Sequence, residues 1–161
     1  MDQLRHRFIQ LNVAVVAFHI VTTVICVALR WPAQFGGAGD PDNVAMEMWL
    51  RGTAIGAPVV LTIILAVATL AAARPGRVGT AGTIVIVLIS LLIIVGGSGE
   101  AFGVPSPDVP TAVLIFSGVM NVLLSLATLY VAYRLLRGSP QRQAIPTPPP
   151  GRPANGRHPP M

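Results

Sequence analysis

Three polar residues recur at every seventh position of a stretch that is otherwise apolar. Residues 12–26, NVAVVAFHIVTTVIC, carry Asn12, His19 and Cys26. Positions seven apart on an α-helix differ in direction by only about 20°, so the three side chains share one helix face. An imidazole on that face can hydrogen-bond across to a neighbouring helix, relay a proton or contact a ligand. The spacing therefore predicts a polar site around His19.

A second polar stripe lies near the other end of the apolar sequence and offers partners for the first. It consists of Ser117, Asn121, Ser125 and Thr128, at three- and four-residue spacing. His19 follows Arg7 by twelve residues and Asn121 precedes Arg134 by thirteen, so both stand at a similar depth from a basic anchor. Polar groups without partners in hydrocarbon cost several kcal/mol. We therefore expect the stripes to face each other, with His19 near Asn121; the candidate intramembrane site comprises Asn12, His19, Asn121, Ser125 and Thr128.

Two interpretations of this site stay open at the level of sequence. In the first, His19 is a neutral, packed hydrogen-bonding group; in the second, it lines a path for protons or a ligand. A metal site is not expected, because no second His, Cys or carboxylate stands at ligand spacing. The chain has no lysine and one cysteine, which excludes a phosphate-binding loop with its lysine, a Schiff base and an intrachain disulfide. We expect no cofactor and name no catalytic residue.

The composition indicates which elements must position these residues. The chain has 161 residues, of which 53% are hydrophobic and only 11% charged, whereas soluble domains have about a quarter charged. A membrane-spanning helix needs about 20 apolar residues. Four segments meet or approach this, at about 8–29, 53–73, 78–97 and 111–136. The predicted fold is all-α: an antiparallel bundle of four transmembrane helices. A cleaved signal peptide is the alternative for the first segment.

The arginines predict how the bundle is oriented. Nine of the eleven fall at the two termini and in the RPGR link between the second and third spans, whereas only Arg30 and Arg51 fall on the other side. In membrane proteins, Lys and Arg are more frequent in the loops and ends on the cytoplasmic side. We therefore expect a multi-pass protein of the bacterial inner membrane with both termini cytoplasmic. The basic charge is then a topology signal, so no nucleic-acid partner is expected, and the lipid bilayer is the expected surrounding.

Loops and ends carry further expectations. Asp42 fits as the N-cap of a short interfacial helix in the first outer loop, beginning near Asn43. Gly52 and Gly56 form a GxxxG match that predicts close helix packing within the second span, where Pro58 would introduce a kink. We expect residues 1–137 to form the membrane domain and residues 138–161, with eight prolines, to form a disordered cytoplasmic tail.

The layout of arginine-rich ends, the tight RPGR turn, a glycine-rich outer loop and a proline-rich tail resembles small four-span integral membrane proteins of actinobacteria that have no assigned function. Small multidrug exporters also have four spans, but they depend on a glutamate in the first span, where this chain has His19. These observations favour a non-enzymatic structural or accessory subunit of the cell envelope, with a membrane-protein partner or a second copy as its binding partner. A small transporter or channel with a path near His19 and Asn121 is the alternative; a lipid-acting enzyme of the outer surface is a third.

Overall fold

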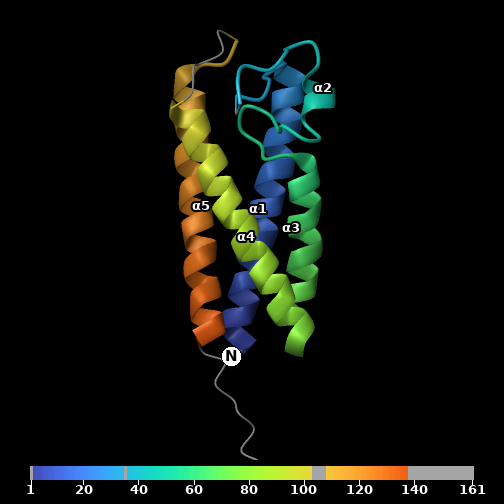
Figure 1. Cartoon of the computed structure of the whole chain (residues 1–161), viewed down its shortest axis with the longest axis vertical. Helices are drawn as coiled ribbons and strands as arrows, with labels where there is room; N and C mark the ends of the chain where they lie inside the picture. The colour runs from blue at the N-terminus through green and yellow to red at the C-terminus, as the bar shows by residue number, and fades with distance from the viewer. Residues whose placement is uncertain (1, 35, 103–107, 138–161) are drawn as a thin grey trace, which may run out of the picture.

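The computed structural model describes residues 2–34, 36–102 and 108–137, and these form five α-helices without any strand (Figure 1). The all-α class predicted from the sequence is therefore correct. The region predicted to be a disordered tail, 138–161, lies outside the described residues. The helices are α1 (Asp2–Leu29), α2 (Val44–Glu47), α3 (Val59–Ala72), α4 (Gly76–Phe102) and α5 (Thr111–Arg137).

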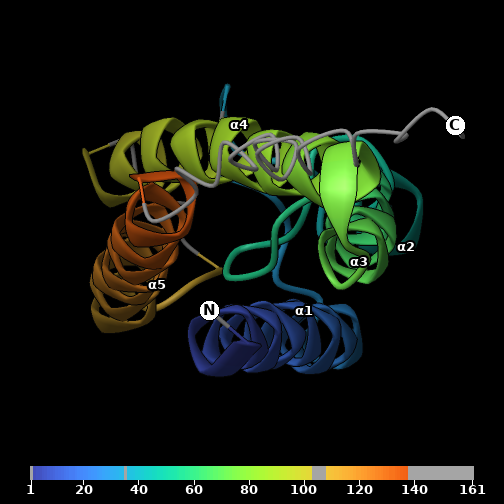
Figure 2. The same ribbon diagram turned by 90° about the horizontal axis from the view of Figure 1, so that it is seen from below.

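The four long helices form an antiparallel ring. Helix α1 contacts α3 and α5, and α4 contacts the same two helices from the opposite side (Figure 2). The expected proximity of the first and last spans is thus present as the α1–α5 contact. The start of α1, the turn between α3 and α4 and the end of α5 lie at one end, and α2 lies at the other (Figure 1). The basic anchors used to compare the depths of His19 and Asn121 therefore share one end.

The bundle is apolar outside and partly polar inside. Large aliphatic side chains face outward on all four long helices, such as Val24 at 63% exposed, Val67 at 61%, Leu88 at 56% and Leu123 at 56%. Many of the buried side chains, in contrast, are Thr, Ser, Asn or His. Helices α1, α4 and α5 are long and apolar enough to cross a bilayer. This inversion of the usual soluble pattern marks a membrane protein.

The second predicted span requires a correction. A continuous helix over 53–73 was expected, but α3 begins only at Val59. Its 14 residues reach about 21 Å, short of the roughly 30 Å of a hydrocarbon core. Pro58 lies at the N-cap with φ −48° and ψ 134°, so it begins α3 instead of kinking it. Proline has no N–H to donate and favours extended conformations in the residue before it, so the helix does not continue upstream.

The other three spans are longer than predicted. Helix α1 ends at the predicted Leu29 but begins at Asp2, six residues before the predicted start. Helix α5 ends one residue beyond its predicted limit, and α4 runs from Gly76 to Phe102 and exceeds the predicted 78–97 at both ends. Helix α2 has only four residues, and its N-cap is Asn43 without a side-chain cap bond, not the predicted Asp42. Asp42 instead pairs with Arg30 at 3.2 Å. The short α2 occurs where the prediction placed an interfacial helix.

Candidate functional site

A non-helical segment occupies the space between the helices where two predicted site residues meet. We call residues 52–58 the central loop. Figure 2 shows it as the teal-green loop in the middle of the ring of helices. Gly52, Thr53, Ala54 and Gly56 are all buried. Backbone that leaves the helix at membrane depth loses its helical hydrogen bonds, and it is tolerated only where protein groups replace them.

His19 supplies one of those replacements from α1. The backbone N–H of Ala57 donates to Nδ1 of His19 over 3.2 Å, and the imidazole is 1% exposed. Because Nδ1 accepts this bond, the ring of the neutral histidine carries its proton on Nε2. A doubly protonated ring would have no acceptor for Ala57. The contact therefore requires a neutral imidazole.

Asn121 supplies the matching replacement from α5. Its Nδ2 donates to the backbone carbonyl of Ile55 at 3.3 Å and to Oγ of Ser117 at 3.3 Å. Ser117 Oγ also donates to the same Ile55 carbonyl at 3.4 Å. The central loop is thus held from α1 through an N–H and from α5 through a carbonyl two residues away.

The predicted contact between His19 and Asn121 is therefore indirect. Both side chains face inward, as their spacing predicts, and both stand at the same level of the bundle. Among the hydrogen bonds of the described residues, none joins the two; each binds the central loop instead. A third stretch of backbone lies between the two stripes, because the second span is not helical at this depth. The similar depths of His19 and Asn121, counted along the sequence, do not reveal this intervening backbone.

The loop also satisfies its own polar groups. Thr53 N–H donates to the Gly56 carbonyl at 2.9 Å, and Gly56 N–H donates to Thr53 Oγ1 at 3.0 Å. The first free N–H groups of α3 are bonded as well: Val59 donates to the Met48 carbonyl at 2.9 Å and Val60 to that of Trp49 at 3.3 Å. The start of α3 is therefore tied to the segment after α2 instead of to lipid.

The two glycines predicted to pack one helix against another act differently. Gly52 and Gly56 lie in the central loop, so neither belongs to a helix. Gly52 has φ 84°, which residues with a side chain rarely adopt. A side-chain carbon on Gly56 would collide with Oγ1 of Thr23 on α1 and come within 3.0 Å of Thr53 Oγ1. Gly56 therefore permits the loop, not a second helix, to approach α1.

The remaining predicted site residues are buried away from this loop. Asn12 is 1% exposed; its Nδ2 donates to the Phe8 carbonyl at 2.8 Å, and its Oδ1 has no partner among the described residues. Ser125 and Thr128 are 5% and 2% exposed, one and two turns beyond Asn121 on α5. The structure thus brings two of the five candidates, His19 and Asn121, to one short segment.

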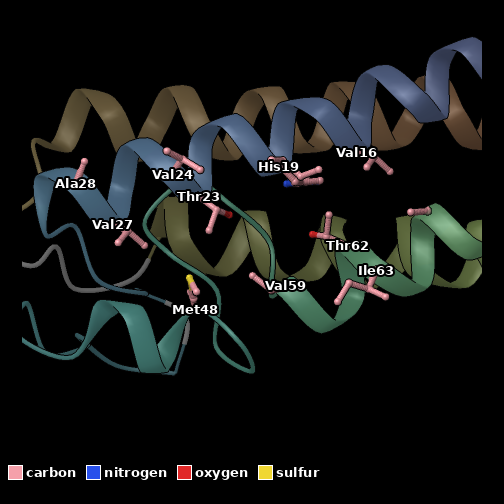
Figure 3. Close-up of a pocket in the computed structure, with 12 residues that line it drawn as sticks. Val16, His19, Thr23, Val24, Val27, Ala28, Met48, Val59, Thr62 and Ile63 are labelled. Carbon is pink, nitrogen blue, oxygen red and sulfur yellow. The ribbon is translucent and has the colours of Figure 1, made fainter.

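An apolar groove of about 630 Å³ runs between α1 and α3 on one side of this site. Figure 3 shows its walls, with Val24 and Val27 on α1, Val59 and Ile63 on α3, and Met48 at one end. His19 and Thr62 face each other across it, and Thr23 adds a second hydroxyl. Along α1 the lining extends from Val16 to Ala28, about 18 Å at 1.5 Å per residue. The groove is thus as long as several turns of helix.

A second cavity, of about 320 Å³, borders the central loop. It is lined by Asn121, by Ile55 and Ala57 of the loop, by α4 around Gly96, and by Arg51 toward the outer loops. Among the described residues, none lines both cavities, and only the second cavity is lined by residues of the central loop.

The charged groups of the site lie beyond the loop, toward α2. Arg51 Nη1 pairs with Glu47 Oε1 at 2.7 Å, and its Nη2 donates to the Gly37 carbonyl at 2.8 Å. Both side chains of this pair are partly buried, whereas the Arg30–Asp42 pair is largely exposed. In the part of the chain that the structure describes, no three His, Cys, Asp or Glu side chains lie together in a way that could hold a metal ion.

Sequence reasoning missed the central loop and with it the roles of Thr53, Ser117 and the Ile55–Ala57 backbone. A signal was present, because two glycines and a proline within seven residues interrupt a helix more readily than they pack it. Comparisons with protein-family models, curated proteins and solved structures found no match for this chain. Function must therefore be argued from the site alone.

Proposed function

We propose that the protein is a non-enzymatic accessory subunit that receives a transmembrane helix of a partner membrane protein in the groove between α1 and α3. One observation carries this proposal. The polar side chains at mid-depth, His19 and Asn121, are engaged in holding the central loop, while the larger of the two cavities described above is an apolar groove at the surface of the bundle. The groove, and not the interior, is then the binding surface.

The chemistry of the groove favours a helix as its occupant. Helices associate in membranes through small residues that permit close approach and through Ser, Thr and His side chains that hydrogen-bond across the interface. The groove combines both types, with Ala28 and Ala66 beside Thr23, Thr62 and His19. The Thr62 hydroxyl already donates to the Pro58 carbonyl at 3.2 Å, so it can accept a hydrogen bond from a Ser or Thr of an incoming helix. A lipid chain has no such donor.

Site-specific photocrosslinking in the native membrane tests this function. A photoreactive residue at Val24 or Ile63, on the rims of the groove, should form an adduct with one defined membrane protein. The same residue at Leu123 of α5 or Leu88 of α4, which are similarly exposed, should not. Adducts of twice the protein's own mass would identify a second copy as the occupant, and adducts with lipid only from both rims would refute the accessory role.

The same proposal includes placement in the bilayer. We infer four crossings, with α3 and the central loop together forming the second, and with both termini on the cytoplasmic face of the bacterial inner membrane. Support comes from the clustering of Arg5, Arg7, Arg74, Arg77, Arg134 and Arg137 at one end of the bundle.

Cysteine labelling tests this orientation in a Cys26→Ala background. A cysteine in place of exposed Arg77 should react with a membrane-impermeant maleimide only after the cells are opened. A cysteine in place of exposed Asp42 should react in intact cells. The reverse pattern would invert the topology, and equal labelling of both in intact cells would contradict the placement.

A small transporter or channel is the second candidate, and one observation favours it. His19 and Asn121 both bind the central loop, and His19 lines one cavity while Asn121 lines the other. Displacement of the loop would join them into a path with polar groups. If this is the function, His19→Ala should change solute uptake or proton flux in proteoliposomes; an unchanged flux would remove this candidate and leave the accessory role untouched.

A further inference from the structure

The imidazole of His19 has a second polar atom that the central loop does not use. Nδ1 accepts from Ala57 N–H, so Nε2 carries the proton and is a donor. Among the described residues, no group accepts a hydrogen bond from Nε2. The side chain is 1% exposed, yet Nε2 is not one of the atoms that are both unpartnered and closed to solvent. An oxygen the size of water can therefore reach this donor, and His19 lines the groove between α1 and α3.

Thr62 offers the opposite kind of group on the facing wall. Its hydroxyl donates to the Pro58 carbonyl at 3.2 Å, which uses its proton and leaves the lone pairs of Oγ1 to accept. Thr62 is 8% exposed and lines the same groove. Figure 3 shows the two side chains facing each other, His19 from α1 and Thr62 from α3. The groove thus has a donor on one wall and an acceptor on the other, at one level.

We infer that the helix in this groove presents a Ser or Thr hydroxyl between the two walls, where its oxygen accepts from Nε2 of His19 and its proton is donated to Oγ1 of Thr62. This rests on the proposed function, to which it adds the residue type that the groove recognises. A backbone carbonyl has no proton for Thr62, and an N–H group cannot accept from His19, whereas a hydroxyl does both through one atom. A carboxamide needs two atoms on a longer side chain, and Ser and Thr are among the small residues that let helices approach closely.

The outer surface of this chain does not offer such a hydroxyl to a second copy. Among the described residues, the exposed Ser and Thr side chains of the long helices are Thr80 and Thr111. Thr80 lies in the second turn of α4 and Thr111 begins α5, so they stand near opposite ends of the bundle (Figure 1). Between these levels the outward side chains are aliphatic, such as Val21 and Leu88. The hydroxyl at the depth of His19 therefore comes from a different membrane protein.

A dilution experiment measures the contribution of the acceptor wall. The photoreactive residue is placed at Val24 in native membranes, which are fused with increasing amounts of lipid before irradiation. The dilution that halves the adduct yield is the midpoint. Thr62→Val should lower this midpoint about threefold, the factor that an average interhelical hydrogen bond contributes. The valine variant should fold, because the Pro58 carbonyl also accepts from Thr62 N–H at 3.0 Å.

Two variants of the same helix are the controls. Thr62→Ser keeps the hydroxyl and should retain the midpoint. Thr69→Val removes a hydroxyl that makes the same kind of bond, to the Leu65 carbonyl at 2.7 Å, but is buried away from the groove, so it should retain the midpoint as well. An adduct whose midpoint is unchanged by Thr62→Val would overturn this inference and leave the accessory role intact. The absence of any adduct with another membrane protein would overturn both.

The partner residue tests both walls at once. Mass spectrometry of the adduct identifies the helix, and Ala in place of its Ser or Thr at this level should lower the midpoint roughly ninefold, because two such bonds are lost. Adding Thr62→Val to that substitution should change little, since the two residues share one interaction. A partner helix without Ser or Thr at this level, fully additive effects, or a second copy in the adduct would each overturn the inference.

Discussion

The coupling between His19 and Asn121 gives the sharpest test of the central loop. The two side chains make no hydrogen bond to each other, yet each holds the same seven-residue segment. We consider the substitutions His19→Leu and Asn121→Leu, singly and together. Leucine is an apolar side chain of comparable size. The main loss is therefore the hydrogen bond from Ala57 N–H in one case and the bonds to the Ile55 carbonyl and Ser117 Oγ in the other.

The magnitude follows from the groups left behind. His19→Leu leaves the Ala57 N–H without its acceptor, at about 1–3 kcal/mol. Asn121→Leu removes two hydrogen bonds, one to the Ile55 carbonyl and one to Ser117 Oγ, and at about 0.5–1.5 kcal/mol each the loss is again about 1–3 kcal/mol. Once either bond is lost, the loop can shift and part of the second penalty disappears. The double variant should therefore lose less stability than the two single losses combined, with a coupling of about 0.5–2 kcal/mol, in the range measured for residues that share a network.

Unfolding by dodecyl sulfate in mixed micelles, followed by tryptophan fluorescence, measures the cycle. Trp31 and Trp49 report on this region because their carbonyls accept from Ala54 N–H and Val60 N–H. Thr128→Val is the control; it lies seven residues beyond Asn121 on α5, about 10 Å along the axis, and should combine additively with His19→Leu within about 0.5 kcal/mol. Additivity of His19→Leu with Asn121→Leu would refute the shared loop.

Two further predictions use matched pairs of residues. Gly56→Ala should destabilise the protein by about 1–3 kcal/mol, because the new methyl group collides with Thr23 Oγ1. Gly96→Ala, with open space around the new methyl group, should be neutral or slightly stabilising in the same unfolding assay. Equal losses of stability in the two variants would contradict the close approach of the central loop to α1. Arg51→Leu should speed proteolytic cleavage within residues 36–50 several-fold, because it removes the contacts to Glu47 and Gly37. Arg30→Leu should not speed cleavage, since the Arg30–Asp42 pair is largely exposed. Equal cleavage of both variants would show that Arg51 does not hold the first outer loop.

The helical parts of the fold were predictable because lipid imposes strong rules on sequence. Three long apolar helices and the inward direction of both polar stripes follow from hydropathy and from the repeat of Asn12 and His19. The prediction of the second span was wrong because its apolar sequence continues through residues 53–58, whereas the helix does not extend over them. Gly52 and Pro58 indicate that the helix is interrupted there, but a count of apolar residues does not take helix-breaking residues into account.

The candidate site was only partly predictable for a related reason. Side-chain periodicity indicates which residues face inward, so His19 and Asn121 could be found. It does not indicate that their partners are backbone groups, since an N–H or a carbonyl has no residue type. Ile55 and Ala57 enter the site through main-chain atoms alone, and no pattern of side chains marks them.

This arrangement bears on how polar residues inside small membrane proteins should be interpreted. A histidine at mid-bilayer is commonly taken as a sign of proton or ligand traffic. Here Ala57 needs an acceptor because α3 begins only after Pro58, so the Ala57 N–H has no intrahelical carbonyl, and among the described residues the imidazole of His19 supplies that acceptor. The non-helical segment before α3 therefore explains the buried histidine without any role in transport. A functional assignment for such a residue should begin with the backbone group whose hydrogen bond it completes.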